Sequence, residues 1–238
     1  MQITPVCSTG ILVRRYKRFL ADIDTGSDVL TVHCPNTGRM VGCSEPGSKV
    51  WYSDSNNLKR KYRHTLEMVS TSNGLVGINT MRANPLFSEA FHEGRIEELG
   101  GYTELRSEPQ TLDGSGRFDF LLCNDNESCF VEVKNVTLGY GGGLGAFPDA
   151  VSIRALRHVN QLAAARASGY RAVLFFCVQH SGVRTVILAD EIDSSYGEAV
   201  RSAVENGVEV IAYGCSMNPA QIAVRERLMV DFSPRARS

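Results

Sequence analysis

Apolar and polar side chains alternate over short distances in the first eighty residues, which is the pattern of β-strands with one buried face. Turns rich in glycine, proline, asparagine and aspartate separate these runs. We expect strands within residues 12–24, 29–34, 50–53 and 63–79, the last range holding two strands around Ser72-Asn73-Gly74. About five short strands with little helix predict a small barrel, and the OB barrel is a common nucleic-acid-binding form of this size.

From residue 83 onward, helix-like and strand-like segments alternate, which indicates an α/β unit. Apolar positions recur every three to four residues in 84–99 and 151–168, which predicts amphipathic helices. The unbroken apolar run 171–178 predicts a central strand buried on both faces. The glycine-rich residues 139–149 lack the Lys-Ser or Lys-Thr pair of a phosphate-binding loop and are expected to form a mobile flap. The other expected elements are a hairpin of strands 117–122 and 128–138, strands 184–189 and 208–213, a helix over 194–206 and a C-terminal helix.

The chain is therefore expected to be α/β overall, with an OB-like β-barrel in residues 1–82 and an α/β domain in residues 83–238. Of its 238 residues, 43% are hydrophobic and 21% are charged, and charges interrupt every apolar run before it reaches the length of a membrane helix. Seven cysteines without a Cys-x-x-Cys pair argue against a disulfide framework and a zinc site. These features, with no secretory signal at the N-terminus, predict a cytoplasmic protein without a membrane partner.

The formal net charge of −1 hides an asymmetry between the two predicted domains. Residues 1–82 hold 11 Lys+Arg and 6 Asp+Glu, a net +5, and the remaining residues hold 14 and 20, a net −6. Basic groups contact phosphates and aromatic rings stack on bases, so two basic clusters in the first domain favour a nucleic acid partner. The clusters are Arg14, Arg15, Lys17 and Arg18 with Tyr16 and Phe19, and Lys59, Arg60, Lys61 and Arg63 with Tyr62.

A solvated surface is the alternative for these charges, and core packing is favoured for Phe19 and Trp51. No predicted helix has the features of a base-reading helix. We therefore expect binding to DNA or RNA with low sequence specificity and a strong salt dependence.

Three residues of the predicted hairpin carry the candidate chemistry: Asp119, Glu132 and Lys134. Side chains two residues apart in a strand share a face, and strand pairing can bring Asp119 to Glu132. Two carboxylates are ligands for Mg²⁺ or Mn²⁺, and a lysine can orient a water and neutralise charge during phosphodiester hydrolysis. The spacing D-x12-E-x-K is typical of PD-(D/E)XK nucleases. An ion pair of Lys134 with either carboxylate on a half-exposed sheet is the alternative that these residues leave open.

Segments along nearly the whole chain match one known pattern. They include HCPNTGRM (33–40), SNNLKRKYRHTLE (55–67), GRIEELGGY (94–102), RFDFLL (117–122), FVEVKNVTL (130–138), FPDAVS (147–152), RHVNQL (157–162), GYRAVLFFCVQH (169–180) and GVEVIAYG (207–214). With these segments the chain resembles the sugar fermentation stimulation protein A (SfsA) family. The resemblance implies an OB-like barrel joined to a PD-(D/E)XK nuclease-like domain, in DNA-binding proteins linked to the regulation of sugar (maltose) metabolism and sometimes labelled DNA/RNA nucleases. It places the family's nuclease-like triad on Asp119, Glu132 and Lys134.

Several other residues are candidates for accessory roles. An acidic residue from the preceding helix often completes such metal sites, and the choice among Glu97, Glu98 and Glu108 stays open. His158 and Gln161, one turn apart on the helix 151–168, can face the site and steady a phosphate, or form a surface pair. Asp149, just before that helix, is expected to be its N-cap rather than a metal ligand.

We therefore expect a non-specific DNA-binding protein with a metal-dependent phosphodiesterase (nuclease) site, in the cytoplasm, with association with the nucleoid left open. The alternative is a DNA-binding regulatory protein whose nuclease-like domain is catalytically silent. The intact triad favours the nuclease, and the family's regulatory description favours the regulator.

Overall fold

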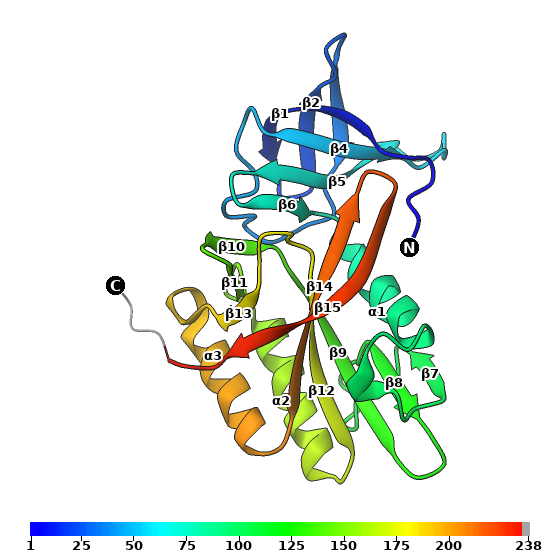
Figure 1. Cartoon of the computed structure of the whole chain (residues 1–238), viewed down its shortest axis with the longest axis vertical. Helices are drawn as coiled ribbons and strands as arrows, with labels where there is room; N and C mark the ends of the chain where they lie inside the picture. Colours follow the sequence, from blue (N-terminus) through cyan, green and yellow to red (C-terminus); the bar gives the residue numbers. More distant parts are fainter. Residues whose placement is uncertain (235–238) are drawn as a thin grey trace.

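The computed structural model describes residues 1–234, which form two domains stacked along the long axis of the molecule (Figure 1). The first domain is a closed barrel. Its strands pair in the order β3-β2-β1-β4-β5-β6, and the pairing of His33 in β3 with Thr65 in β5 closes β1–β5 into a five-stranded barrel. This arrangement confirms the predicted OB fold. The strands are β1 (Ser8–Tyr16), β2 (Leu20–Asp24), β3 (Val29–His33), β4 (Lys49–Asp54), β5 (His64–Thr71) and β6 (Gly74–Gly77).

The first predicted strand, 12–24, is in fact two strands joined by a tight turn. Lys17 and Arg18 have left-handed backbone angles, with φ of 51° and 65°, and they reverse the chain between β1 and β2. Turns of this kind usually contain glycine or asparagine, so two basic residues give no sequence signal for the reversal. The turn leaves Phe19 45% exposed, and its expected core packing is wrong. Trp51 is partly buried against an apolar cluster, as expected.

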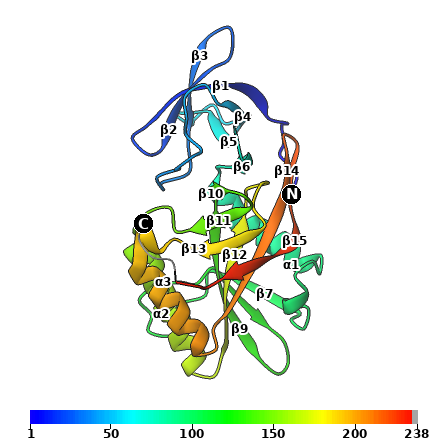
Figure 2. The ribbon, with the colours of Figure 1, turned by 60° about the vertical axis from the view of Figure 1, so that its left-hand side comes forward.

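The second domain is built on a nine-stranded mixed sheet in the order β10-β11-β13-β15-β14-β12-β9-β8-β7. Helix α1 lies on one face of this sheet, and α2 and α3 lie side by side on the other (Figures 1 and 2). Strand β12 runs parallel to both of its neighbours and is buried beyond its first residue, which confirms the predicted central strand. No helix within residues 1–234 is long and apolar enough to cross a bilayer. The elements are η1 (Thr80–Arg82), α1 (Ala83–His92), η2 (Glu97–Leu99), β7 (Glu104–Ser107), β8 (Phe120–Cys123), β9 (Ser128–Val136), β10 (Leu138–Gly141), β11 (Leu144–Phe147), α2 (Ile153–Ala167), β12 (Arg171–Val178), β13 (Thr185–Leu188), α3 (Asp190–Glu205), β14 (Glu209–Asn218) and β15 (Gln221–Asp231).

Three predicted segments of the second domain fold differently. The expected C-terminal helix is strand β15, which pairs antiparallel with β14 and parallel with β13. Ile222, Ala223 and Val224 are buried there, because the sheet supplies both backbone partners and an apolar surface, and these outweigh local helix propensity. The segment 139–149, expected as a mobile flap, lies largely in the hairpin β10–β11, whose second strand also pairs with β13. The helix predicted over 84–99 ends at His92.

Contacts between the domains seat the barrel on the second domain. Arg82, the last residue of the short helix that links the barrel to α1, binds Glu67 of β5 through its guanidinium at 2.7 Å. The N-terminal residues 1–7 run beside the β14–β15 hairpin, where Ile3 N donates a hydrogen bond to Ala220 O at 2.7 Å. The barrel therefore sits over the C-terminal end of β9, close to the hairpin that carries the candidate chemistry (Figure 1).

Candidate active site

The hairpin β8–β9 brings the acidic pair and the lysine together. The antiparallel pairing of these strands places Asp119, which directly precedes β8, beside Glu132. Asp119 Oδ2 accepts a hydrogen bond from Val133 N at 2.7 Å. Glu132 and Lys134 share the face of β9 that is covered by α2, because side chains alternate along a strand.

Glu132 is the centre of a buried polar cluster. Its side chain is 2% exposed, Oε1 accepts a hydrogen bond from Lys134 Nζ at 2.5 Å, and the same oxygen is paired with Nδ1 of His158 in α2. Burial is the largest influence on the pKa of Glu132 and raises it. The contacts with His158 and Lys134 together outweigh burial and hold this pKa below its usual value. The carboxylate is therefore ionised at neutral pH, in an ion pair with Lys134.

The other oxygen of this carboxylate, Oε2, is buried and has no hydrogen-bond partner within residues 1–234. An ionised oxygen in this position is costly unless a cation binds it. Burial and the negative charge of Glu132 also raise the pKa of neighbouring Asp119. A divalent cation between the two carboxylates fits both observations, because it would use the free oxygen and offset the repulsion.

The protein supplies few ligands of its own for such an ion. The described part of the chain contains no group of three or more His, Cys, Asp or Glu side chains suited to a metal. A cation at Asp119 and Glu132 would therefore complete its coordination with water or backbone oxygens, as Mg²⁺ commonly does.

Asn84, in the first turn of α1, is a site residue that the sequence pattern missed. Its Nδ2 donates a hydrogen bond to Asp119 Oδ1 at 2.8 Å. The preceding helix was expected to supply an acidic residue, and it supplies this amide instead. An asparagine at a helix start is ordinary, so only the docking of α1 against β8 reveals its role.

Two of the accessory candidates lie near the acidic pair. His158 contacts Glu132 directly, as described above. Glu108 is adjacent to Asp119 through the backbone, since Glu108 N donates to Asp119 O at 2.9 Å. Its carboxylate, however, is 70% exposed and is paired with Arg117 at 2.9 Å.

The other three candidates lie elsewhere, and Glu97, at the start of η2, is exposed. The Glu98 carboxylate accepts a hydrogen bond from the Tyr213 hydroxyl at 2.8 Å and also pairs with Arg227. Gln161 Nε2 donates to Ser115 Oγ at 3.0 Å, outside the contacts of Glu132. One turn of helix α2 is therefore enough to separate Gln161 from the site that His158 reaches.

Asp149 is not the N-cap of α2, contrary to the expectation. Ser152 is the cap, since its Oγ accepts the hydrogen bond of Ala155 N at 3.1 Å. Asp149 Oδ2 instead accepts a hydrogen bond from Met40 N in the barrel at 3.2 Å. The residue therefore ties a barrel loop to the second domain, which no local pattern could indicate.

Helix α2 adds two arginines beside His158, Arg154 and Arg157, that the sequence pattern did not connect with the site. Arg154, Arg157 and His158 line a cavity together with Arg117 and Asp119. Arg154 Nε donates to His158 Nε2 at 3.5 Å. Positive side chains therefore lie directly beside the acidic pair, in an arrangement suited to phosphate groups.

Each basic cluster of the barrel contains some residues that are engaged in contacts within the protein and others that are exposed without an ion pair in the described chain. Arg14 and Arg63 form ion pairs with aspartates, each with an N···O distance of 2.7 Å. Arg15 donates hydrogen bonds to the carbonyl oxygens of Asn36 and Gly38, at 2.7 and 2.8 Å, and so supports a loop. The exposed members of the clusters without an ion-pair partner in the described chain are Lys17, Arg18, Lys59, Arg60 and Lys61.

Comparison with known proteins agrees with this architecture. Residues 13–78 match the family model of the SfsA N-terminal OB domain, and residues 81–221 match that of the sugar fermentation stimulation protein RE domain. A sugar fermentation stimulation protein homolog from Teredinibacter turnerae is 52% identical over 232 residues, which cover 97% of this chain and 99% of the relative. A homolog of the same name from Pseudoalteromonas atlantica is 49% identical, with 92% and 94% covered.

A solved structure resembles the whole molecule. It is the structure of Pyrococcus furiosus SfsA in complex with Ca²⁺, which superposes with a TM-score of 0.88 at 25% sequence identity and covers 97% of this chain and 98% of that chain. The relative therefore has both domains, and they are placed relative to each other as in this chain. With matches over both domains and over nearly the full length, the chain belongs to the sugar fermentation stimulation protein (SfsA) family.

Proposed function

We propose that this protein is a metal-dependent nuclease that cuts phosphodiester bonds in nucleic acid held with low sequence specificity. The observation that carries the proposal is the Oε2 atom of Glu132, an ionised oxygen that is buried beside Asp119 without a partner in residues 1–234, with Lys134 on the same face. The restriction-endonuclease-like domain of the family supports this reaction class. The Ca²⁺ complex of the Pyrococcus furiosus relative supports binding of a divalent ion.

Each residue of the site has a distinct role in this proposal. Asp119 and Glu132 would hold Mg²⁺ or Mn²⁺, which prefer carboxylate oxygens. Such an ion, when bound, polarises a phosphate and lowers the pKa of a water. Lys134, only 13% exposed, supplies positive charge against the charge that develops on the phosphate. His158 and Asn84 are positioning residues, because each holds one of the two carboxylates.

The barrel would hold the phosphate backbone through two loops. Residues 17–19 join β1 to β2 and residues 55–63 join β4 to β5, and OB barrels bind oligonucleotides with the loops in these positions. The five basic residues listed above as having no ion-pair partner in the described chain lie on these loops. Since they contact phosphates and not base edges, binding of this kind has low sequence specificity.

Two cavities that share Pro85 as a wall residue form a candidate path from the barrel to the acidic pair. Arg60 and Pro85 line one cavity, and Pro85 also lines the next, together with Asn84 and Asp119. A strand bound at the loop 55–63 would follow this path to the carboxylates. Beyond them, the arginines of α2 would take up its further phosphates.

One observation favours the alternative of a DNA-binding regulatory protein with a silent site. Glu132 Oε1 is already engaged by both Lys134 and His158, so the cluster is partly satisfied as an ion pair. A site stabilised in this way needs no metal to fold. The family's name connects it with sugar metabolism, and a regulator of such genes is the function that this alternative implies.

Cleavage assays separate the two proposals. Supercoiled plasmid, single-stranded DNA and RNA are incubated with Mg²⁺ or Mn²⁺, with EDTA as the metal-free control. We expect cutting by the wild type, a loss of about 100-fold or more in Asp119→Asn, Glu132→Gln and Lys134→Met, and no change in Glu104→Gln, an exposed carboxylate on β7. Cutting that persists in all three site variants contradicts the nuclease. Binding without any cutting supports the regulator.

A further inference from the structure

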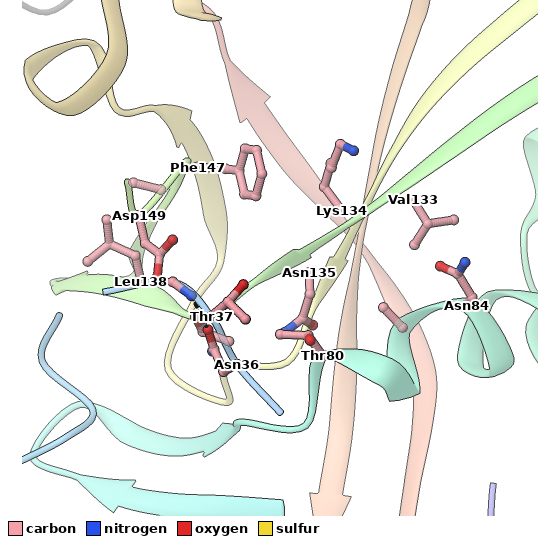
Figure 3. A pocket seen from close by; sticks show the side chains of 14 residues that line it. Asn36, Thr37, Thr80, Asn84, Val133, Lys134, Asn135, Leu138, Phe147 and Asp149 are labelled. Carbon is pink, nitrogen blue, oxygen red and sulfur yellow. Dashed lines mark hydrogen bonds between the residues drawn. The ribbon is translucent and has the colours of Figure 1, made fainter. Parts of the chain in front are cut away.

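A cavity of about 320 Å³ lies between the two domains, beside Lys134 (Figure 3). Its walls come from the barrel loop 36–38, the start of α1, the end of β9 and the hairpin β10–β11. Sites for small molecules usually enclose about 300–1,000 Å³. This cavity is at the small end of that range and suits a single ring system such as one nucleobase.

Amide side chains supply much of its polar lining, namely those of Asn36, Asn84 and Asn135. Asn135 Oδ1 accepts a hydrogen bond from Gln179 Nε2 at 2.6 Å, but Asn135 Nδ2 is buried with no partner in residues 1–234. A buried donor left unpaired is costly, and a ligand acceptor that reached it would offset this cost; the buried acceptor Gln179 Oε1 also has no partner in residues 1–234. The edges of nucleobases present carbonyl and ring-nitrogen acceptors of this kind.

Phe147 supplies an apolar wall of the cavity. Its ring contacts the ring of Tyr196 edge-on, with centroids 5.3 Å apart, and that of Phe176 at 5.6 Å, so the core holds it in place. In Figure 3 the Phe147 ring and the Lys134 side chain lie above Asn36. An aromatic ring fixed in this way can stack on a base of any kind.

The barrel closes the cavity through a contact that leaves no room for a side chain. A Cβ atom at position 38 would lie 2.2 Å from Asp149 Oδ2, so only Gly38 permits this approach. Met40 N donates to the same oxygen at 3.2 Å. The loop is thus pinned to the second domain, and the cavity is a defined part of the interface between the domains.

We propose that this cavity holds one unpaired base of a nucleic acid strand whose phosphate lies at Asp119 and Glu132. The inference rests on the proposed nuclease function and specifies its substrate. Lys134 and Asn84 line the cavity and also contact Glu132 and Asp119, respectively. One nucleotide would therefore reach the cavity with its base and the acidic pair with its phosphate. A paired base cannot enter without leaving its stack, so the substrate is single-stranded or locally opened nucleic acid.

Binding measurements test this inference independently of cleavage. The probes are two fluorescent strands with equal numbers of phosphates, an oligothymidine and a strand of abasic residues, and anisotropy is recorded in EDTA. Thr37 is exposed on the cavity wall, so Thr37→Phe fills the space and Thr37→Ser is the matched control. We expect Thr37→Phe to weaken oligothymidine binding about tenfold, the size of one stacking contact. The affinity of Thr37→Phe for the abasic strand is expected to stay within about twofold of the wild-type value. Thr37→Ser is expected to bind both strands within about twofold of the wild type.

A second variant, Asn135→Leu, removes the unpaired donor together with the acceptor of Gln179 Nε2 and is expected to act in the same direction, with a cooperative thermal unfolding transition as the check on folding. Equal effects of Thr37→Phe on both strands, or none on either, would overturn the base site. So would saturable binding of free thymidine monophosphate that fails to compete with oligothymidine, because the cavity would then serve a small molecule. If the strand-selective effect appears but the wild type cuts nothing, the base site stands and the nuclease proposal fails.

Discussion

The side-chain amide of Asn84 donates a hydrogen bond to Oδ1 of Asp119 at 2.8 Å and so connects the start of α1 with the hairpin of the acidic pair. Val133 N binds the other oxygen of the same carboxylate at 2.7 Å. Both oxygens of Asp119 are therefore oriented by the fold before a ligand binds. Partners that orient a ligating carboxylate strengthen metal binding and catalysis.

Replacement of Asn84 tests this relationship. We expect Asn84→Leu to lower the rate of metal-dependent cutting by about 10- to 100-fold, the usual effect of removing a group that orients a metal ligand. Affinity for an abasic strand in EDTA should stay the same in gel-shift titrations, because the barrel loops are untouched and such a strand places no base in the cavity that Asn84 lines. A folded Asn84→Leu protein with full activity would show that Asp119 needs no positioning.

The salt dependence of binding tests the barrel loop 55–63. Each phosphate contact on a single strand contributes about 0.7 to the slope of log affinity against log salt. The combined change of Lys59, Arg60 and Lys61 to glutamine should therefore lower the slope by about 2. Arg106→Gln, on the edge strand β7, is the control and should leave the slope unchanged. An unchanged slope in the triple variant would exclude the loop 55–63 as the docking surface.

The ion pair between Arg82 and Glu67 should stabilise the junction of the domains. Glu67 is 1% exposed, and the guanidinium of Arg82 contacts its carboxylate at 2.7 Å. Arg82→Met leaves this carboxylate buried without its charge partner, which costs about 3–5 kcal/mol of unfolding free energy. Urea unfolding measures the change, and Arg106→Met, which breaks an exposed pair, should cost under about 1 kcal/mol. A loss below about 1 kcal/mol for Arg82→Met would mean that the hydrogen bonds from Ser53 and Asn79 are enough to stabilise the buried carboxylate of Glu67.

Asp22 should make the stability of the barrel depend on pH. Burial raises its pKa, but hydrogen bonds from Thr31, Arg14 and Tyr16 outweigh burial and lower the pKa in the folded state. A depressed pKa stabilises the fold above the unfolded value, about 3.9, and this stability is lost as the pH falls through the folded value.

Asp22→Asn should therefore be less stable than the wild type at pH 7, by about 1–3 kcal/mol, the usual effect of removing a hydrogen-bonded charge. The difference should shrink below about pH 4 as the wild-type carboxyl becomes protonated. Urea unfolding at several pH values provides the measurement. A stability gap that stays constant down to about pH 3 would contradict the assignment.

The elements predicted correctly have strong local patterns. The unbroken apolar run of β12 determines that this strand is buried on both faces. Alternation along β9 places Glu132 and Lys134 on one face, although both faces of β9 are buried. The wrong predictions concern segments where a distant partner decides. Residues 221–231 form a strand only because β14 and β13 are there to pair with them. The division of the chain after residue 82 stays a prediction.

The sequence by itself determined the OB barrel, the α/β domain and the spacing of two acids and a lysine, because these depend on short periodic patterns and on residue chemistry. Only the tertiary structure decided that Asn84 orients Asp119, that His158 reaches Glu132 while Gln161 does not, and that Asp149 contacts the barrel. Each of these contacts, including that of Gln161 with Ser115, joins residues at least 26 positions apart. Such contacts depend on how helices and domains dock, and the energy of docking is spread over many side chains that no local pattern records.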